Sequence, residues 1–433
     1  MSTFAHNVVA PRLACDSLVA LGAATVDGST LFAKNSDRPA RECQPLLQAP
    51  RQHHRSGARL RCTYIEIPQV AETARLIGSR PYWCWGFEHG LNEHGVAIGN
   101  HTVFTRDILG NAGLIGMDLV RLGLERGHSA EEAVDTIAAL LATYGQGGAG
   151  YADTPLPYHN SFLVADRRAA FVLETSDRQW AARRVNDIAS LSNHLTIATD
   201  WDALSSGAIE HAIAAGWWNE ARDERFDFAA AYRDSSIVPE AFSAGRHQRT
   251  CALLGRDRGR MTIDSLKRTL RDHSGSLPGA AEPTLEDPHA FSVCMHADPF
   301  GTTTASVIAD ISPDADAALV YRASFGSPCI GVFIPLYLDA EIPTELMRGG
   351  ADPSDDSTWW QFNALLQIVA QDWKRRLPYV RGVFDRFETS IEERVYTERL
   401  SSRSATHKAA FMRDTLNDLL VRVQQLTAEL TQR

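Results

Sequence analysis

Short apolar segments recur in pairs along the chain, and a turn signal separates the members of each pair. Three such pairs are residues 17–20 with 30–33, residues 161–165 with 170–174, and residues 306–311 with 318–322. The first pair is joined through Asp27-Gly28, a dipeptide that favours tight hairpin turns. Strands joined by short turns pair antiparallel. The sequence therefore predicts largely antiparallel sheets.

Helical segments lie between the predicted hairpins. Residues 116–126 are apolar with interspersed arginines, and the segment stops at Gly127. A capping-box pattern, Ser129 with Glu132, then precedes apolar positions spaced by three and four over residues 134–141. Sheets covered by helices on their faces predict an α+β layered domain.

The character of the chain changes near residue 345, and residues 346–433 are predicted to form a helical C-terminal extension. Residues 348–358 are rich in Gly, Asp, Ser and Pro, which is typical of a loop. Phe362, Leu366, Val369 and Trp373 predict one helix. A seam of leucine and valine over residues 416–430 predicts another. That seam either packs on its own domain or forms the coiled coil of a homodimer.

Composition excludes several classes of function. The 433 residues carry 43 basic and 53 acidic side chains, a net charge of −10, so no nucleic-acid partner is expected. No apolar run approaches the ~20 residues of a membrane helix, and no secretory signal is evident, so a cytoplasmic protein without a membrane partner is expected.

Cysteine and histidine spacing predicts neither disulfides nor metal. The seven cysteines are scattered and contain no Cys-x-x-Cys, so no disulfide framework and no structural zinc are expected. The order His-Glu-x-x-His is absent as well. We therefore expect no metal site and no cofactor.

Cys15 is the first candidate for chemistry. It opens the first predicted strand, while Lys34 and Asp37 lie at the end of the partner strand. A hairpin would bring a thiol, a cation and a carboxylate together. Residue type alone does not decide the matter, because an unpaired cysteine is most often buried packing and Lys34 with Asp37 could be a surface pair.

The motif around Cys15 resembles a known family. Residues 15–39 resemble the start of secernins and related bacterial dipeptidases, a branch of the N-terminal-nucleophile (Ntn) hydrolases. The similarity continues through residues 79–86, 90–96, 116–127, 172–175 and 303–306, and it covers roughly residues 15–335. More distantly the chain is similar to penicillin V acylases and bile-salt hydrolases.

This resemblance implies a fold and a mechanism. Residues 15–345 would form the four-layer αββα Ntn-hydrolase sandwich, and residues 1–14 would be a propeptide removed on maturation. A thiol has a pKa near ~8.5 and an α-amine one near ~7.8, so the amine freed on Cys15 could serve as general base for its own thiol. Attack on an amide would give a thioester that water then hydrolyses.

The resemblance also implies partners for Cys15. Asp37 matches the carboxylate that holds the new α-amine. Lys34 stands where the acylase branch has an arginine, which keeps the charge but not the planar fork. Asn100 and Asn193 match asparagines that donate to the oxyanion, although asparagine also caps turns often.

Other residues are assigned less firmly by the resemblance. An arginine is expected near the sulfur, and both Arg246 and Arg249 qualify, with Arg249 preferred; Arg249 could equally be a solvated charge. Arg246 is then a substrate-binding candidate, together with Arg80 and Trp83. Trp83 could instead belong to the core.

Function follows from these assignments as an expectation. The chain is expected to hydrolyse a small amide, with a dipeptide as the expected substrate. The alternative enzyme is an acylase or amidase for a non-peptide amide, because related sites share one apparatus and the fold does not set the substrate. A non-catalytic, secernin-like interaction protein is the alternative from another class.

Overall fold

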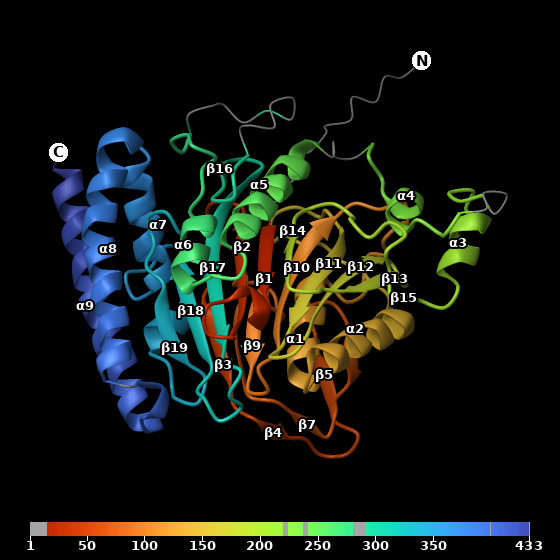
Figure 1. The fold of residues 1–433 in the computed structure, drawn as a ribbon, viewed down its shortest axis with the longest axis horizontal. Helices are drawn as coiled ribbons and strands as arrows, with labels where there is room; N and C mark the ends of the chain where they lie inside the picture. The colour runs from red at the N-terminus through yellow and green to blue at the C-terminus, as the bar shows by residue number, and fades with distance from the viewer. Residues whose placement is uncertain are drawn as a thin grey trace.

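Two antiparallel sheets form the centre of the computed structural model (Figure 1). The structure describes residues 15–219, 224–236, 241–279, 284, 291–398 and 400–432. The predicted propeptide, residues 1–14, lies outside the described residues.

The first sheet has seven strands in the order β14-β1-β2-β17-β18-β19, with β16 paired to β17. These strands are β14 (Ile188–Leu191), β1 (Cys15–Ala20), β2 (Thr30–Arg38), β17 (Gly301–Ile311), β18 (Val320–Phe325), β19 (Ile334–Tyr337) and β16 (His296–Ala297). The predicted hairpins at residues 17–33 and 306–322 are confirmed as β1–β2 and β17–β18.

The second sheet has eight strands in the order β15-β13-β12-β11-β10-β9-β8-β3. They are β15 (Ala203–Leu204), β13 (Gln179–Arg184), β12 (Ala170–Ser176), β11 (His159–Ala165), β10 (Ala97–Val103), β9 (His89–Asn92), β8 (Leu76–Ser79) and β3 (Leu46–Ala49). Two short ribbons, β4 (Gln52–His53) with β7 (Glu72–Thr73) and β5 (Arg59–Arg61) with β6 (Glu66–Pro68), stand apart from it. The predicted hairpin at residues 161–174 is confirmed as β11–β12.

Helices cover the outer face of each sheet. Helices α1 (Gly116–Arg126) and α2 (Ala130–Tyr144) pack on the second sheet, and α5 (Ala241–Asp257) and α6 (Ile263–Leu270) pack on the first. The Ser129 side chain caps α2 by accepting from the Glu132 amide. Short helices α3 (Ala208–Ala214) and α4 (Phe228–Tyr232) lie in the connection to α5. The predicted α+β layered fold, helix–sheet–sheet–helix, is confirmed.

Strand β1 is buried on both faces, and this fixes where its side chains point. Leu18 packs with Leu254 and Leu266 of the α5–α6 layer, whereas Val19 belongs to the core shared with the second sheet. Successive side chains of a strand alternate between its faces. Cys15 therefore faces the second sheet, and Asp16 faces α5.

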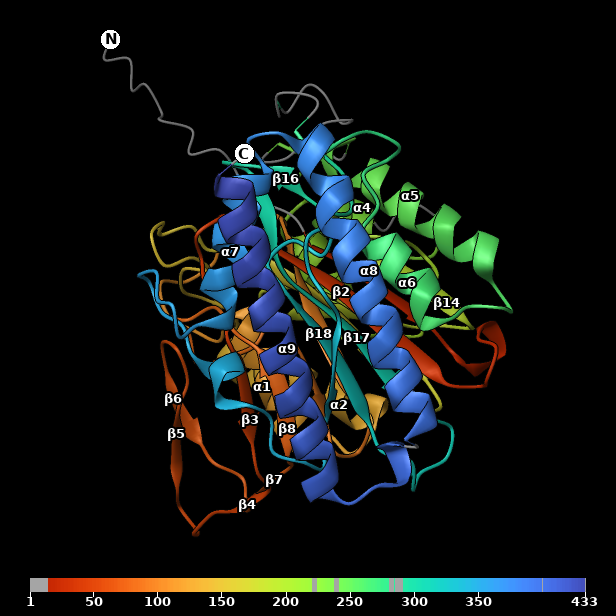
Figure 2. The ribbon, with the colours of Figure 1, turned by 90° about the vertical axis from the view of Figure 1, so that its left-hand side faces the viewer.

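Three helices follow the last strand. They are α7 (Thr358–Val369), α8 (Trp373–Thr397) and α9 (Ala405–Thr431), and Figure 2 shows α8 and α9 lying along one side of the molecule. The prediction that Trp373 continues the helix of Val369 is wrong. The Asp372 side chain accepts from the Arg375 amide and so starts a new helix at Trp373.

The apolar seam of α9 is used within the chain. Helix α9 packs against β19 and α7, and its seam residues, Leu416, Leu419, Val423, Leu426 and Leu430, are all buried. Of the two arrangements left open by the sequence, the structure shows packing on the same chain. Among the described residues, no helix is both long enough and apolar enough to cross a membrane.

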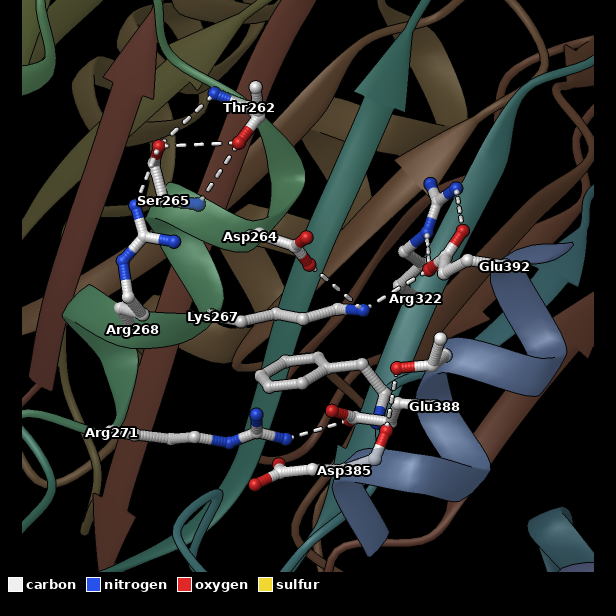
Figure 3. A network of polar contacts seen from close by, with 12 residues as sticks. Thr262, Asp264, Ser265, Lys267, Arg268, Arg271, Arg322, Asp385, Glu388 and Glu392 are labelled. Atoms are coloured by element: carbon white, nitrogen blue, oxygen red, sulfur yellow. Dashed lines mark hydrogen bonds and ion pairs between the residues drawn. The ribbon is translucent and has the colours of Figure 1, made fainter.

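Ion pairs connect α8 with α6 and with the first sheet (Figure 3). Glu388 accepts from Arg271 at 2.7 Å and from the Phe333 amide at 2.8 Å. One turn further on, Glu392 lies 3.2 Å from the Lys267 Nζ and 3.3 Å from Arg322. The pKa of Glu388 is lowered, because its ion pairs, led by Arg271, outweigh the effect of burial.

Removing the charge of Glu388 should destabilise the fold. We expect Glu388→Gln to lower the free energy of unfolding by about 3 kcal/mol, since Arg271 then remains largely buried without its partner. Urea denaturation measures the difference. Asp385→Asn is the matched control, because the Asp385 side chain lies one turn away on α8 and is 60% exposed. Equal losses in the two variants would contradict a structural role for the Glu388 pair.

Candidate active site

Cys15 opens β1 and lies opposite Ser36 of β2, while Ser17 lies opposite Lys34. The alternation of strand side chains therefore puts Cys15 and Lys34 on the same face, toward the second sheet. Both are buried, with Cys15 only 5% exposed. The hairpin brings the predicted thiol and cation together.

Glu88, the residue directly before β9 of the second sheet, meets this pair, and sequence reasoning did not select it for the site. Its Oε2 lies 2.8 Å from the Lys34 Nζ and 3.9 Å from the Cys15 Sγ. Its Oε1 lies 3.2 Å from Arg38. Burial alone would raise the pKa of Glu88, but the two cations outweigh burial and lower it. Glu88 is therefore an ionised carboxylate beside the sulfur.

Asn193 holds the backbone nitrogen of Cys15. The Cys15 N–H donates to the Asn193 Oδ1 at 3.0 Å, and the Asn193 Nδ2 donates to the Thr102 carbonyl at 2.9 Å. The amide thus presents its oxygen, not its N–H, to Cys15. One N–H of the Nδ2 group is used by Thr102 and the second is not, so the oxyanion donor that the resemblance implies at Asn193 stays a prediction.

Arg246, rather than Arg249, is the arginine that the fold brings to β1. Its Nη1 lies 2.7 Å from the Asp16 Oδ2, and its Nη2 donates to the Asn193 Oδ1 at 2.7 Å. Arg249 forms a two-bond pair with Asp272, and its side chain is 41% exposed. The arginine that the resemblance expects near the sulfur stays a prediction, because Arg246 meets the buried Asp16, which requires a cation, on the face of β1 opposite the thiol.

Asp37 lies at the end of β2 with one oxygen satisfied and one free. Its Oδ1 accepts from the Thr303 hydroxyl, and among the described residues its buried Oδ2 meets no hydrogen-bond partner. Burial raises the pKa of Asp37 to about 8, although Arg246 opposes the shift. At neutral pH the uncut chain therefore holds Asp37 mainly as the neutral acid.

This raised pKa predicts a pH-dependent stability. The unfolded chain loses the Asp37 proton near its ordinary pKa of ~3.9, whereas the folded chain keeps it until about pH 8. Unfolding therefore releases a proton in that interval, and stability should fall as pH rises from about 4 to about 8, by up to ~1.4 kcal/mol per pH unit.

Asp37→Asn tests the assignment of this titration. Urea unfolding across the interval, on chains that still carry residues 1–14, should show a flatter dependence of stability on pH for the variant. The exposed Asp385 provides the comparison, and Asp385→Asn should leave the dependence unchanged. An unchanged slope in Asp37→Asn would show that Asp37 keeps an ordinary pKa.

Asn100 lies in a chain of side-chain amides that ends at Glu88. Gln146, in the loop after α2, accepts from Asn160 at 3.1 Å, and Asn160 lies 3.1 Å from the Asn100 amide. The Asn100 Nδ2 donates to the Asn160 Oδ1, and with the Asn100 amide turned over it would lie instead 3.0 Å from the Glu88 carbonyl and 3.1 Å from Oε2. The amide donor predicted at Asn100 is thus brought within the same group as Cys15.

Arg80 and Trp83 lie on the segment that precedes Glu88. Arg80 donates to the Cys84 carbonyl at 3.2 Å, and burial lowers its pKa. Trp83 packs on a small cluster that includes Met117, whose sulfur also contacts Asn100. The Met117 side chain therefore lies between Trp83 and Asn100. The Arg80 guanidinium is bound by the backbone carbonyl of Cys84.

The protonation of Cys15 shows what the site still needs. Burial raises the pKa of the thiol to about 12, although Lys34 opposes the shift. A thiol with such a pKa is neutral at physiological pH and is a weak nucleophile. Catalysis by Cys15 would therefore require a stronger base than the Glu88 carboxylate, whose lowered pKa makes it a poor acceptor for the thiol proton.

Comparison with known proteins gives the class. A sequence profile of peptidase family C69 matches residues 14–384, and the chain belongs to peptidase family C69. Its members are peptidases, a class that hydrolyses amide bonds. The expected membership in a peptidase family is thereby confirmed at the level of family C69.

Solved structures of related shape have low sequence identity. Penicillin V acylase from Agrobacterium tumefaciens is 13% identical, with a TM-score of 0.43, covering 75% of this chain and 86% of that one. A mutant conjugated bile acid hydrolase from Clostridium perfringens is 13% identical, with a TM-score of 0.39, covering 71% and 88%. A Caenorhabditis elegans N-acylethanolamine-hydrolyzing acid amidase ortholog is 12% identical, with a TM-score of 0.35, covering 69% and 93%.

Proposed function

We propose that the protein is an Ntn amide hydrolase of the secernin and dipeptidase type, with Cys15 as its nucleophile and a dipeptide as its substrate. One observation carries the proposal. The Cys15 nitrogen is held 3.0 Å from the Asn193 oxygen, while its sulfur faces the Lys34–Glu88 pair. A residue whose backbone nitrogen and side chain are both held at a buried polar centre is suited to act through both atoms.

Cleavage before Cys15 would supply the missing base. Removal of residues 1–14 converts the amide nitrogen of Cys15 into a free amine with an ordinary pKa of ~7.8, which can accept the thiol proton near neutral pH. Asn193 accepts one N–H of that amine and so orients it. An ionised Asp37 raises the pKa of the Cys15 thiol, which shows that its charge acts at this residue. The same charge would stabilise the ammonium that forms when the amine takes the thiol proton.

The reaction then proceeds in two steps. The Cys15 thiol gives its proton to the amine, and the sulfur forms a bond to the substrate carbonyl carbon. The C–N bond breaks as the leaving amine takes that proton, which leaves a thioester. Water attacks the thioester, the acid is released and the thiol is restored. Asn100 is the proposed donor to the charge that develops on the carbonyl oxygen.

Substrate class is the finer part of the proposal. Lys34 and Arg38 are buried beside Glu88, and Arg80 on the segment before it is the proposed binder of a substrate carboxylate, with Trp83 beside it. A dipeptide carries such a carboxylate. An acylase or amidase acting on a non-peptide amide is the alternative within the same chemistry.

Intact mass followed by a substrate panel tests the proposal. A mature mass that begins at Cys15, with hydrolysis of dipeptides faster than of N-acyl amides, is the expected result. Faster hydrolysis of N-acyl amides would transfer the function to the acylase class. A full-length mass after long incubation, with no hydrolysis of either panel, would refute the enzyme and favour an interaction protein.

A further inference from the structure

Four side chains of types that bind metal ions lie close together near β16 of the first sheet, outside the group around Cys15 and Glu88. They come from three separate segments: His273 follows α6, Cys294 and His296 lie at β16, and Cys329 lies in the turn after β18. Their ligand atoms all lie within 4.8 Å of one another. Neither thiol forms a disulfide in the structure, and both are buried.

The spacing of these atoms fits a tetrahedral metal. The His296 Nε2 lies 3.4 Å from the Cys294 Sγ and 3.3 Å from the Cys329 Sγ. Zinc binds thiolate at ~2.3 Å and imidazole at ~2.0 Å, so sulfur and nitrogen ligands at tetrahedral angles are ~3.5 Å apart. The two distances from the His296 Nε2 to the cysteine sulfurs are therefore close to the distances between ligand atoms in a tetrahedral zinc site.

The fourth ligand supports the same assignment independently. Among the described residues, the buried Nε2 of His273 forms no hydrogen bond of ordinary geometry, its ring lies 5.3 Å from that of His296, and its side chain lies beside the Cys329 thiol of the same cluster. A buried polar atom without a partner is costly unless something binds it. A metal bound by the other three ligands would satisfy it.

We propose that His273, Cys294, His296 and Cys329 form a structural zinc site. Two thiolates and two imidazoles complete a closed four-coordinate shell, which is typical of structural zinc, and soft sulfur ligands disfavour magnesium or calcium. The sequence expectation of no structural zinc rested on the absence of Cys-x-x-Cys. That pattern does not detect the proposed site, because only Cys294 and His296 of its four ligands are close in sequence.

The site would fix the carboxylate of the active site through one strand. Met295, between the two ligands of β16, donates its amide to the Thr303 Oγ1 at 2.8 Å, and the Thr303 hydroxyl donates to Asp37. On the other side, the Trp373 ring at the start of α8 lies 4.8 Å from the His296 ring. The proposed zinc thus holds β16 between Asp37 and α8.

Metal content tests the site without reference to catalysis. The full-length Cys15→Ala chain, purified with a tag that binds no metal and without chelator, should contain one zinc per chain by elemental analysis. After exchange into cobalt(II), the intact chain should show thiolate-to-cobalt absorption bands in the near ultraviolet. Neither readout depends on Cys15, so the proposed function and the zinc site can fail separately.

Variants and a thiol count decide against the alternatives. Cys294→Ser should lose the zinc, whereas Cys251→Ser, an exposed cysteine of α5, should keep it. If Cys294→Ser fails to fold, the cobalt spectrum of the parent chain still decides. A mass lower by two hydrogens, with neither zinc nor cobalt uptake, would show a Cys294–Cys329 disulfide and overturn the proposal. Free thiols without uptake of either metal would also overturn it.

Discussion

Cys15→Ala is expected to abolish both maturation and hydrolysis. Without the sulfur no acyl group can be transferred to residue 15, so the chain should keep its full-length mass, and amide turnover should fall by ~10⁶-fold, as for other enzymes that lose their nucleophile. Intact mass and initial rates on the preferred amide of the panel measure the two effects. The fold should survive, because the side chain shrinks by one atom at a polar centre.

Two comparisons make this result specific. Cys251→Ala removes an exposed thiol on α5 and should mature and turn over as the parent does. Cys15→Ser keeps a weaker nucleophile at the same position and should mature slowly. Parent-like hydrolysis by Cys15→Ala would exclude Cys15 as the nucleophile, whatever the mass shows.

Arg246→Met is expected to be the most damaging change away from the sulfur. The guanidinium is buried and binds both Asp16 and Asn193. Its loss leaves the Asp16 carboxylate buried without a partner, which should cost about 3–5 kcal/mol of the free energy of unfolding. Asn193 also loses the donor that orients it, so the turnover of any folded enzyme should fall as well.

Arg249→Met is the matched control, three residues along the same helix. Its pair with Asp272 is 41% exposed on the arginine side, so its removal should change stability by less than ~1 kcal/mol. The double change Asp16→Leu with Arg246→Met should recover much of the lost stability but not the lost turnover, because Asn193 still lacks the bond from Arg246. Equal losses for Arg246→Met and Arg249→Met would contradict the placement of Arg246.

The sequence predicted the part of the site that one hairpin carries. Cys15 and Lys34 meet because alternation and register follow from the turn at Asp27-Gly28. It could not predict Glu88, which reaches the sulfur only through the packing of one sheet on the other. An acidic residue within a buried segment signals that a cation must be near, but it does not say which cation.

The different surroundings of Arg246 and Arg249 could not be predicted for a related reason. Both lie on α5, and the rotation of a helix about its axis is set by what it packs on. Asp16 could have indicated which arginine is buried, since a carboxylate in a strand that is buried on both faces needs a buried cation. Similarly, the proposed ligand cluster around His296 joins separate segments, and it forms only where the end of α6, β16 and the turn after β18 come together in the folded chain.

The buried charged groups around Cys15 determine how the net charge of the interior would change on cleavage. Lys34, Arg38 and Arg246 face the carboxylates of Asp16, Glu42 and Glu88, and a protonated Asp37 leaves this set electroneutral in the uncut chain. Cleavage before Cys15 would add an ammonium at the same place. If Asp37 then gives up its proton, neutrality is preserved, so the freed terminus would be charged without the interior gaining net charge.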